Sequence, residues 1–547
     1  MRGNLLVFLV LLPSVCGAQA VTRADAVAAM KKAAAFFHDK VSTHGGYHFA
    51  YTDDLSYGRS EHSETPNRVE VQREGTPRAG MAFLEAYDAT GDRFFLDAAR
   101  SVARALMAGQ LCSGGWDYWI EFDPAKRKRF PYRADNNCHP AELEGRPVTT
   151  LDDNVTQACE RLLMRVDKAL GFSDRAIHEA SLYALESLMK AQYPIGAWPQ
   201  RYSEFPDPEK FPVARAGYPD DWPRKWPHAN YQSYYTFNDN TISDAIDMML
   251  EAARVYDDRR YLDSAERGGQ FILLAQMPDP QPAWAQQYDA RMHPAWARQF
   301  EPPSVTGGES QGILRTLLVL YRETGKRKYL EPVPRALRYL KASALPPVDH
   351  PVEARSRIRP GPVLARFYEL KTNRPLYITK GTMIHAKGVP TVARPDGYEL
   401  SYSDASVITH YGVLVSGAAL ASIEDEYKSL MAADAASIRR PEKLHGLSPW
   451  SGESGGGVSD VGALIRSMDA RGAWTEEGVI GKADRVISVF AARPMVLMIN
   501  GKPTPIREND TIELFQGAQP PRVRIIRTVT FARNLEALAA YAASLGK

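Results

Sequence analysis

Asp92-Arg93-Phe94-Phe95-Leu96 is the first of four similar stretches that organise most of the 547-residue chain. The echoes are Asp174-Arg175-Ala176-Ile177, Asp258-Arg259-Arg260-Tyr261-Leu262 and Lys326-Arg327-Lys328-Tyr329-Leu330. Their leading arginines follow one another at intervals of 82, 84 and 68 residues. Self-similarity at a regular interval is typical of repeated supersecondary units.

Each unit predicts a helix, a glycine-containing turn and a further helix. Seventeen residues after the first three arginines stand Gln110, Gln192 and Gln276, and six residues later in the first two units stand Trp116 and Trp198. Apolar residues recur at helical spacing over 24–37, 80–87, 96–107, 156–166, 177–191, 242–255 and 313–322. Helix pairs of this length can close into a ring or stack into an open solenoid, and the long polar loops after the tryptophans favour the ring. We therefore predict a mainly α fold, an (α/α) toroid.

The last hundred residues differ from the helical part. Residues 451–458 are glycine-rich, and short strands are predicted over 486–490, 495–499 and 511–515, with Asn500-Gly501 as a hairpin turn. A final helix is predicted over 531–545. We accordingly divide the chain into a signal peptide (1–20), the toroid catalytic domain (21–440), a loop with a small β excursion (441–525) and the closing helix of the toroid (526–547).

Composition and the N-terminus indicate an exported protein. The 67 Lys and Arg residues nearly balance the 65 Asp and Glu residues, which argues against a nucleic-acid partner. Arg2, the apolar run 5–12 and Ala18-Gln19-Ala20 resemble a signal peptide, and the run is too short to span a membrane. We expect a secreted or periplasmic monomer without a membrane partner.

Export would leave three cysteines, Cys112, Cys138 and Cys159. This odd count allows at most one internal disulfide. A Cys112–Cys138 bridge would staple the polar loop between these two residues in an oxidising compartment.

Two clusters place carboxylates and amides directly before apolar helices. One runs from Thr149 to Gln157 and contains Asp152, and the other runs from Tyr235 to Thr241 and contains Asp239. N-capping is one interpretation, because Asp and Asn accept hydrogen bonds from free helix amides. A Ca²⁺ site is the other, since Ca²⁺ prefers oxygen ligands. A helix N-terminus repels a cation, so such a site would need a second anion, which a uronate substrate could supply.

Basic residues beside aromatic ones suggest carboxylate and sugar binding. Arg298 lies between residues 295 and 304, where two prolines predict a loop, with a surface salt bridge to Glu301 as the alternative. Arg366 and Arg374 lie in the segment 365–375, which also fits an ordinary strand and turn. The segment from Trp198 to Tyr202 adds Arg201, and its tryptophan could stack on a sugar ring or pack in the core.

With these clusters in view, the sequence resembles the pectate lyases of polysaccharide lyase family ten. The similar segments lie in the same order over nearly the whole mature chain. They are Gly45-Gly46-Tyr47, Gly75-Thr76-Pro77, Ser113 to Tyr118, the Leu151-Asp152 cluster, Trp198 to Tyr202, Thr236-Phe237-Asn238-Asp239, Trp296 to Ser304, Arg366 to Pro375, Asp469 to Trp474 and the Thr530-Phe531 helix. The resemblance implies an (α/α) toroid and a lyase that cleaves polygalacturonate, an acidic polysaccharide, by calcium-assisted β-elimination.

The resemblance also implies roles for individual residues. Asp152 and Asp239 resemble the calcium-binding and substrate-site aspartates, and Arg298 resembles the catalytic arginine, so Arg298 and Asp239 are the expected catalytic pair. Arg366 and Arg374 resemble substrate-binding arginines, and Arg201 and Trp198 complete the expected substrate-binding set. An arginine that acts as the base implies a very alkaline optimum, because its side chain is ordinarily fully charged, and a role as stabiliser is the alternative.

The sequence departs from the family pattern at two places. Tyr234-Tyr235 replaces a histidine that usually stands shortly before Thr-Phe-Asn-Asp, and Ile408-Thr409-His410-Tyr411-Gly412 replaces an arginine-containing run. Two other functions therefore stay open. One is a glycoside hydrolase that uses Asp152 and Asp239 as its paired carboxylates, and the other is a non-catalytic glycan-binding relative.

Overall fold

The fold is mainly α in the computed structural model, which describes residues 20–346, 361–380, 391–393, 398–403, 414–434, 437–438, 460–480, 486–490, 494–499, 502–506, 511–515 and 522–546. The expected signal peptide apart from Ala20, the glycine-rich stretch 451–458, the turn 500–501 and the segment 408–412 lie outside these residues. Among the described helices, none is both long enough and apolar enough to cross a bilayer.

Consecutive helix pairs form the body of the molecule. They are α2 (Thr76–Thr90) with α3 (Arg93–Ala108), α5 (Val155–Ala169) with α6 (Arg175–Ala191), α7 (Thr241–Tyr256) with α8 (Arg259–Ala275), and α9 (Glu309–Thr324) with α10 (Val333–Ala342). The remaining helices are α1 (Arg23–Phe36), the single-turn α4 (Pro124–Arg127), α12 (Ala419–Ala432), α13 (Val461–Arg466) and α14 (Thr528–Ser544).

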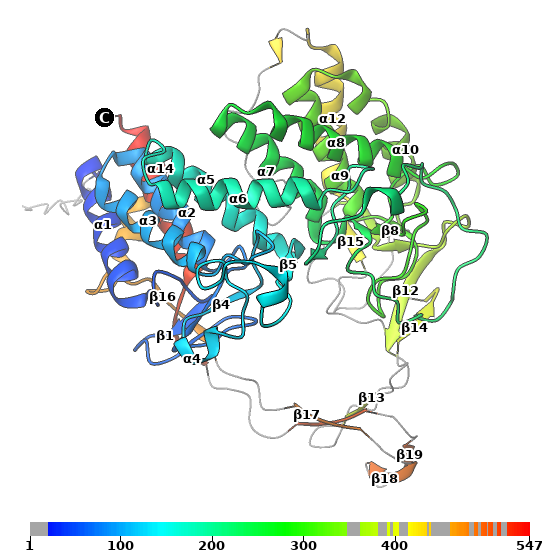
Figure 1. Cartoon of the computed structure of the whole chain (residues 1–547), viewed down its shortest axis with the longest axis horizontal. Helices are drawn as coiled ribbons and strands as arrows, with labels where there is room; N and C mark the ends of the chain where they lie inside the picture. The colour runs from blue at the N-terminus through cyan, green and yellow to red at the C-terminus, as the bar shows by residue number, and fades with distance from the viewer. Residues whose placement is uncertain are drawn as a thin grey trace, which may run out of the picture.

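The first members of these pairs follow one another in space. Helix α2 contacts α5, α5 contacts α7 and α7 contacts α9, while α12 packs on α9 and α14 packs on α1 and α2 (Figure 1). The arrangement belongs to the (α/α) toroid class, as predicted, and α14 is the predicted final helix.

The residues repeated in the sequence hold each unit together. Asp92, Asp174 and Asp258 accept hydrogen bonds from backbone amides at the starts of α3, α6 and α8. The side-chain amides of the three glutamines each donate to two carbonyl groups: Gln110 to Gly114 and Ala180, Gln192 to Gly196 and Ser264, and Gln276 to Pro282 and Pro332. The sequence period is therefore a structural period.

The tryptophans that follow these glutamines are core residues. The indole N–H groups of Trp116 and Trp198 donate to the carbonyls of Leu106 and Leu188, and both side chains are fully buried. Trp284 plays the same part in the third unit, two residues later than the spacing of the first two units. The expectation that Trp198 binds substrate is wrong, because no face of its ring is open to a sugar.

The structure contains more strands before the last hundred residues than the sequence predicted. Many of them span only two or three residues, and such short strands show no alternation of apolar and polar residues by which they could be predicted. They are β1 (Ala50–Thr52), β2 (Gly58–Arg59), β3 (Arg68–Glu70), β4 (Trp119–Glu121), β5 (Thr149–Thr150), β6 (Arg201–Tyr202), β7 (Tyr235–Thr236), β8 (Gln287–Tyr288), β9 (Val305–Thr306), β10 (Val363–Ala365), β11 (Phe367–Tyr368), β12 (Pro375–Lys380), β14 (Tyr398–Ser401) and β15 (Leu414–Ser416). The antiparallel pairs β3–β4, β5–β6, β7–β8 and β9–β11 each join the strand before a helix pair to the strand after it. They bring the starts of α2, α5, α7 and α9 to one face.

The C-terminal strands include the three that were predicted. They are β13 (Thr391–Ala393), β16 (Thr475–Val479), β17 (Val486–Phe490), β18 (Met495–Ile499), β19 (Lys502–Ile506), β20 (Thr511–Phe515) and β21 (Arg522–Arg527). Strand β20 pairs with β17 and with β13, so residues 391–393 join this sheet although they precede residue 441. Figure 1 shows β13 and β17–β19 away from the helices. The domain division itself stays a prediction.

The three cysteines described by the structure form one disulfide and leave one free thiol, in agreement with the predicted Cys112–Cys138 bridge. Cys112 and Cys138 form a disulfide, and Cys159 is a buried thiol on α5. The bridge ties the turn after α3 to the loop that leads toward β5.

Candidate metal and catalytic site

Two structurally equivalent turns carry the aspartates of the site. Strands β5 and β7 each run into a single 3₁₀ turn, Asp152–Asn154 before α5 and Asn238–Asn240 before α7. In each turn the last two residues are left-handed, with φ of 50° at Asp153 and 45° at Asp239. Asp and Asn adopt this conformation more readily than other non-glycine residues. Asp153 is therefore the structural counterpart of Asp239.

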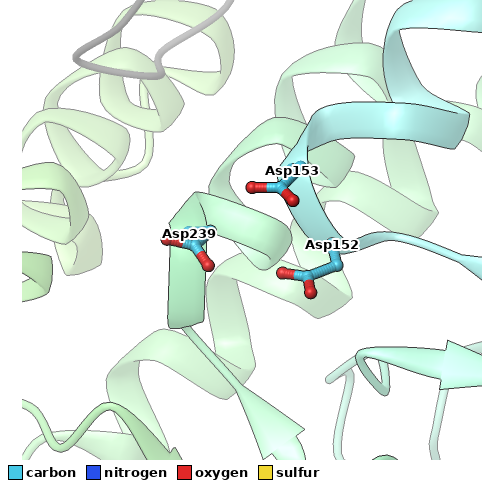
Figure 2. Close-up of side chains that lie close together, drawn as sticks. All are labelled: Asp152, Asp153 and Asp239. Atoms are coloured by element: carbon cyan, nitrogen blue, oxygen red, sulfur yellow. The ribbon is translucent and has the colours of Figure 1, made fainter. Parts of the chain in front are cut away.

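Figure 2 shows the three aspartate side chains facing one another between the starts of α5 and α7. One carboxylate oxygen each of Asp152, Asp153 and Asp239 lies within 4.8 Å of the other two. Neither α5 nor α7 has a side-chain cap hydrogen bond at its N-terminus, so the N-capping interpretation is wrong for both clusters. The sequence analysis quoted Asp153 without selecting it. Aligning Thr150 to Asn154 with Thr236 to Asn240 would have found it.

Mutual repulsion characterises this cluster. Desolvation, followed by repulsion from Asp152, raises the pKa of Asp239 well above its usual value, while Arg366 and Arg298 oppose the rise. Desolvation, then repulsion from Asp152 and Glu61, raises the pKa of Asp153 to about 6. The cluster therefore holds more negative charge than its surroundings compensate, and a cation would relieve it.

Arg298 lies at the edge of the cluster, on the predicted loop. Its Nη2 is 3.7 Å from Oδ2 of Asp239 and 2.7 Å from Oε1 of Glu301, and its guanidinium lies 5.2 Å from the ring centre of Phe300. The expected salt bridge to Glu301 exists, but Glu301 is only 2% exposed, so this is no surface pair. The buried Glu301 holds the guanidinium beside Asp239.

Arg366 approaches the cluster from the strand side. Its Nη2 is 2.7 Å from Oε1 of Glu309, the first residue of α9. Arg366 also lowers the pKa of Asp239, which indicates that its charge is close to that carboxylate. Glu309, which the sequence analysis did not select, thus orients Arg366 as Glu301 orients Arg298.

Arg201 lies on the side of Asp152. It donates to the phenol oxygen of Tyr118 at 3.1 Å, and the same phenol donates to Oδ2 of Asp152 at 3.0 Å. The ring of His62 stacks on Tyr118 with centroids 4.1 Å apart. Gln72 links this wall to the cluster, since its Nε2 donates to Oδ2 of Asp153 at 3.1 Å. Neither His62 nor Gln72 belongs to a repeated motif, so the sequence held no signal for them.

Arg374 lies in a second group, at the turn between β11 and β12. Its guanidinium covers the ring of Tyr402 at 3.5 Å. The phenol of Tyr402 and the guanidinium of Arg224 both donate to Oε1 of Glu369. The described contacts of Arg374 are thus with this group and not with the aspartates.

The donor set fits a hard cation. The cluster consists of carboxylate oxygens, which Ca²⁺ prefers, and Asp152 is 5% exposed with an Oδ1 that finds no hydrogen-bond partner among the described residues. A buried carboxylate oxygen without a partner is costly, and a metal ion would satisfy it. Both helix N-termini disfavour a cation and favour an anion, so the arrangement suits an ion bound together with a carboxylate ligand.

Comparison with known proteins yields one family and several similar structures. The sequence model of a family described as pectic acid lyase matches residues 128–406. A mutant of family 10 polysaccharide lyase from Cellvibrio cellulosa in complex with trigalacturonic acid is 20% identical with a TM-score of 0.42, covering 65% of this chain and 98% of that chain. A D-mannose isomerase is 14% identical with a TM-score of 0.39, covering 63% and 74%. An α-mannanase from Bacteroides thetaiotaomicron is 12% identical with a TM-score of 0.33, covering 59% and 73%. No curated protein matches.

Proposed function

Since the chain belongs to the pectic acid lyase family, we propose that it cleaves polygalacturonate by calcium-assisted β-elimination. The observation that carries the proposal is the group of three aspartate oxygens within 4.8 Å of one another, with the guanidinium of Arg298 3.7 Å from one of them. This arrangement combines the ligands for a hard cation with a cationic group that can contact a uronate.

Asp152, Asp153 and Asp239 would hold the calcium ion. Bound there, calcium would supply Lewis-acid stabilisation of the negative charge that develops on the uronate carboxylate. The three aspartates alone repel a polyanion, so the site accepts an acidic sugar only when a cation is present.

The arginines would act on the sugar. Arg366 and Arg201 bind uronate carboxylates, and Glu309 and Tyr118 hold their guanidinium groups in place. Arg298 takes the proton from C5, the electrons of that C–H bond form the C4–C5 double bond, and the bond from C4 to the glycosidic oxygen breaks. The leaving oxygen then collects a proton from the medium. A guanidine base requires an alkaline medium, so the rate should rise steeply toward high pH.

One assay tests this proposal. The purified protein is incubated with polygalacturonate at alkaline pH, with calcium or with a chelator, and the unsaturated product is followed by its ultraviolet absorbance. We expect calcium-dependent absorbance that Asp239→Asn abolishes. New reducing ends without absorbance would instead indicate a hydrolase, and binding without turnover would indicate a glycan-binding relative.

Export also belongs to this proposal. The leader at residues 1–20 would direct the chain out of the cytoplasm, and the Cys112–Cys138 disulfide is typical of an oxidising compartment. The substrate, an acidic polysaccharide, would be met there.

A further inference from the structure

Gln157 is a buried side chain that bridges the two aspartate turns. It is the third residue of α5 and has no exposed surface. Its Nε2 donates to the carbonyl of Leu151 at 2.9 Å and to that of Thr241 at 3.3 Å. Leu151 directly precedes Asp152, and Thr241 follows Asp239 by two residues. One amide therefore links the backbone on both sides of the cluster.

Thr241 forms a second link at the same place. It is fully buried, and its hydroxyl lies 2.8 Å from the carbonyl of Asn238 and 3.4 Å from that of Leu151. The first contact holds the turn that carries Asp239, and the second reaches the other turn. The hydroxyl has one hydrogen to donate, so Gln157 provides the stronger connection between the turns.

Similar glutamine links occur elsewhere in the fold. The amide of Gln311 donates to the carbonyls of Gly307 and Ser416, and that of Gln276 donates to the carbonyls of Pro282 and Pro332. The link as such is a structural device of the repeat. Gln157 differs from these glutamines in the position of the two carbonyl groups to which it donates. The carbonyl of Leu151 lies one residue from Asp152, and that of Thr241 lies two residues from Asp239.

We propose that Gln157 and Thr241 are positioning residues that set the separation between Asp239 and the Asp152–Asp153 pair, so that a calcium ion finds its ligands already in place. The inference rests on the proposed calcium site. Its physical reason is that three carboxylates within 4.8 Å repel one another and would move their turns apart in the calcium-free protein. Two contacts cross between the turns, from Gln157 to the carbonyl of Thr241 at 3.3 Å and from Thr241 to that of Leu151 at 3.4 Å, and they oppose this movement. Ligands held in place bind an ion more tightly than ligands that must first be gathered.

The test separates calcium affinity from stability. Gln157→Met keeps the length of the side chain and removes both donors, and Gln276→Met makes the same change where no aspartate of the cluster adjoins the linked carbonyls. Calcium binding to the full-length wild type and both variants is measured by calorimetry, stability by urea unfolding, and kcat and KM at saturating and limiting calcium. We expect Gln157→Met to weaken calcium binding by about tenfold, the low end of the effect of groups bonded directly to metal ligands, because Gln157 bonds to backbone carbonyls beside the aspartates. Gln276→Met should lower stability and leave the calcium affinity within twofold of the wild type.

A second pair of variants keeps the test decisive if Gln157→Met fails to fold. Thr241→Val should weaken calcium binding several-fold, and Thr241→Ser, which keeps the hydroxyl, should restore it. Wild-type calcium affinity in both Gln157→Met and Thr241→Val, or an equal loss in Gln276→Met, would overturn the positioning role while the proposed function stands. Absence of calcium binding in the wild type would overturn the proposed site and the positioning role together.

Discussion

Replacing Asp153 with asparagine should stabilise the calcium-free protein and weaken its calcium binding, so the effect on the unfolding temperature reverses sign when calcium is added. The position suits the change. Asp153 is exposed and has a φ of 50°, a conformation that asparagine tolerates. Gln72, whose Nε2 is 3.1 Å from Oδ2 of Asp153, can donate to the new amide oxygen as it does to the carboxylate.

The magnitude follows from the separation of the charges. Oxygens of Asp152 and Asp239 lie within 4.8 Å of an oxygen of Asp153. Coulomb's law gives about 1 kcal/mol per pair at this distance in water and about 3.5 kcal/mol at an effective dielectric constant of roughly 20. Asp153 is exposed at the surface, although desolvation contributes to its raised pKa, so we take the lower figure as a minimum and the two repulsions amount to at least about 2 kcal/mol. With an unfolding entropy of about 2.1 cal/mol/K per residue, a chain of this size should gain about 2 °C.

Thermal unfolding at pH 8, with chelator and with millimolar calcium, measures the effect. Asp257→Asn is the matched control, since Asp257 is also exposed and left-handed with a φ of 52° but lies at the far end of α7. In chelator Asp153→Asn should melt above the wild type, and in calcium below it, whereas Asp257→Asn should track the wild type in both. If Asp153→Asn melts below the wild type in chelator, or if calcium stabilises both proteins equally, the reasoning is refuted.

Four further changes test other parts of the structure. Arg298→Ala should lower kcat for elimination by about 10²–10⁴-fold, with the circular dichroism spectrum unchanged, because it removes the group that takes the C5 proton. The calcium-dependent rise in unfolding temperature should be large at pH 8 and vanish as the pH falls through about 6, because protons then displace calcium from Asp153, whose pKa is raised to about 6. The calcium-free protein should lose stability as the pH rises from 4 to 6, because over this range Asp153 is already ionised in the unfolded chain and still protonated in the folded one. Reduction of the Cys112–Cys138 disulfide, which spans 26 residues, should cost about 3–4 kcal/mol of unfolding free energy in urea titrations. Trp198→Phe should lower stability by about 1–3 kcal/mol, by loss of the bond to Leu188, and leave KM for polygalacturonate unchanged; a raised KM would reinstate Trp198 as a substrate contact.

The helical repeat was predictable because its determinants are local. An N-cap aspartate acts on an amide two or three residues away, and each tryptophan bonds to a carbonyl ten or twelve residues before it. Such short-range contacts leave a fixed spacing in the sequence. Two-residue strands such as β5 and β7 leave none, because two residues cannot display an alternation.

The candidate site was predictable in part. Four of the selected residues lie close together, as expected, because each belongs to a segment that the sequence analysis recognised: Asp152, Asp239, Arg298 and Arg366. An alignment of the two turns would also have found Asp153. Arg374 lies with Tyr402 and not with the aspartates, and the sequence could not show this because residue type does not fix where a turn lies; its role in substrate binding stays a prediction. Trp198 was misread because a tryptophan after a glycine has the same sequence pattern whether it packs or binds.

The sequence by itself thus determined the helix pairs, the closing helix and the carboxylate and amide side chains of the two turns, because these features depend on neighbours along the chain. Packing of α5 against α7 decided which carboxylates share one space, because Asp153 and Asp239 stand 86 residues apart and meet only through tertiary contacts. Packing also placed Glu309 behind Arg366, 57 residues further along the chain, and it buried Glu301, whose salt bridge with Arg298 the sequence had suggested only as a surface pair.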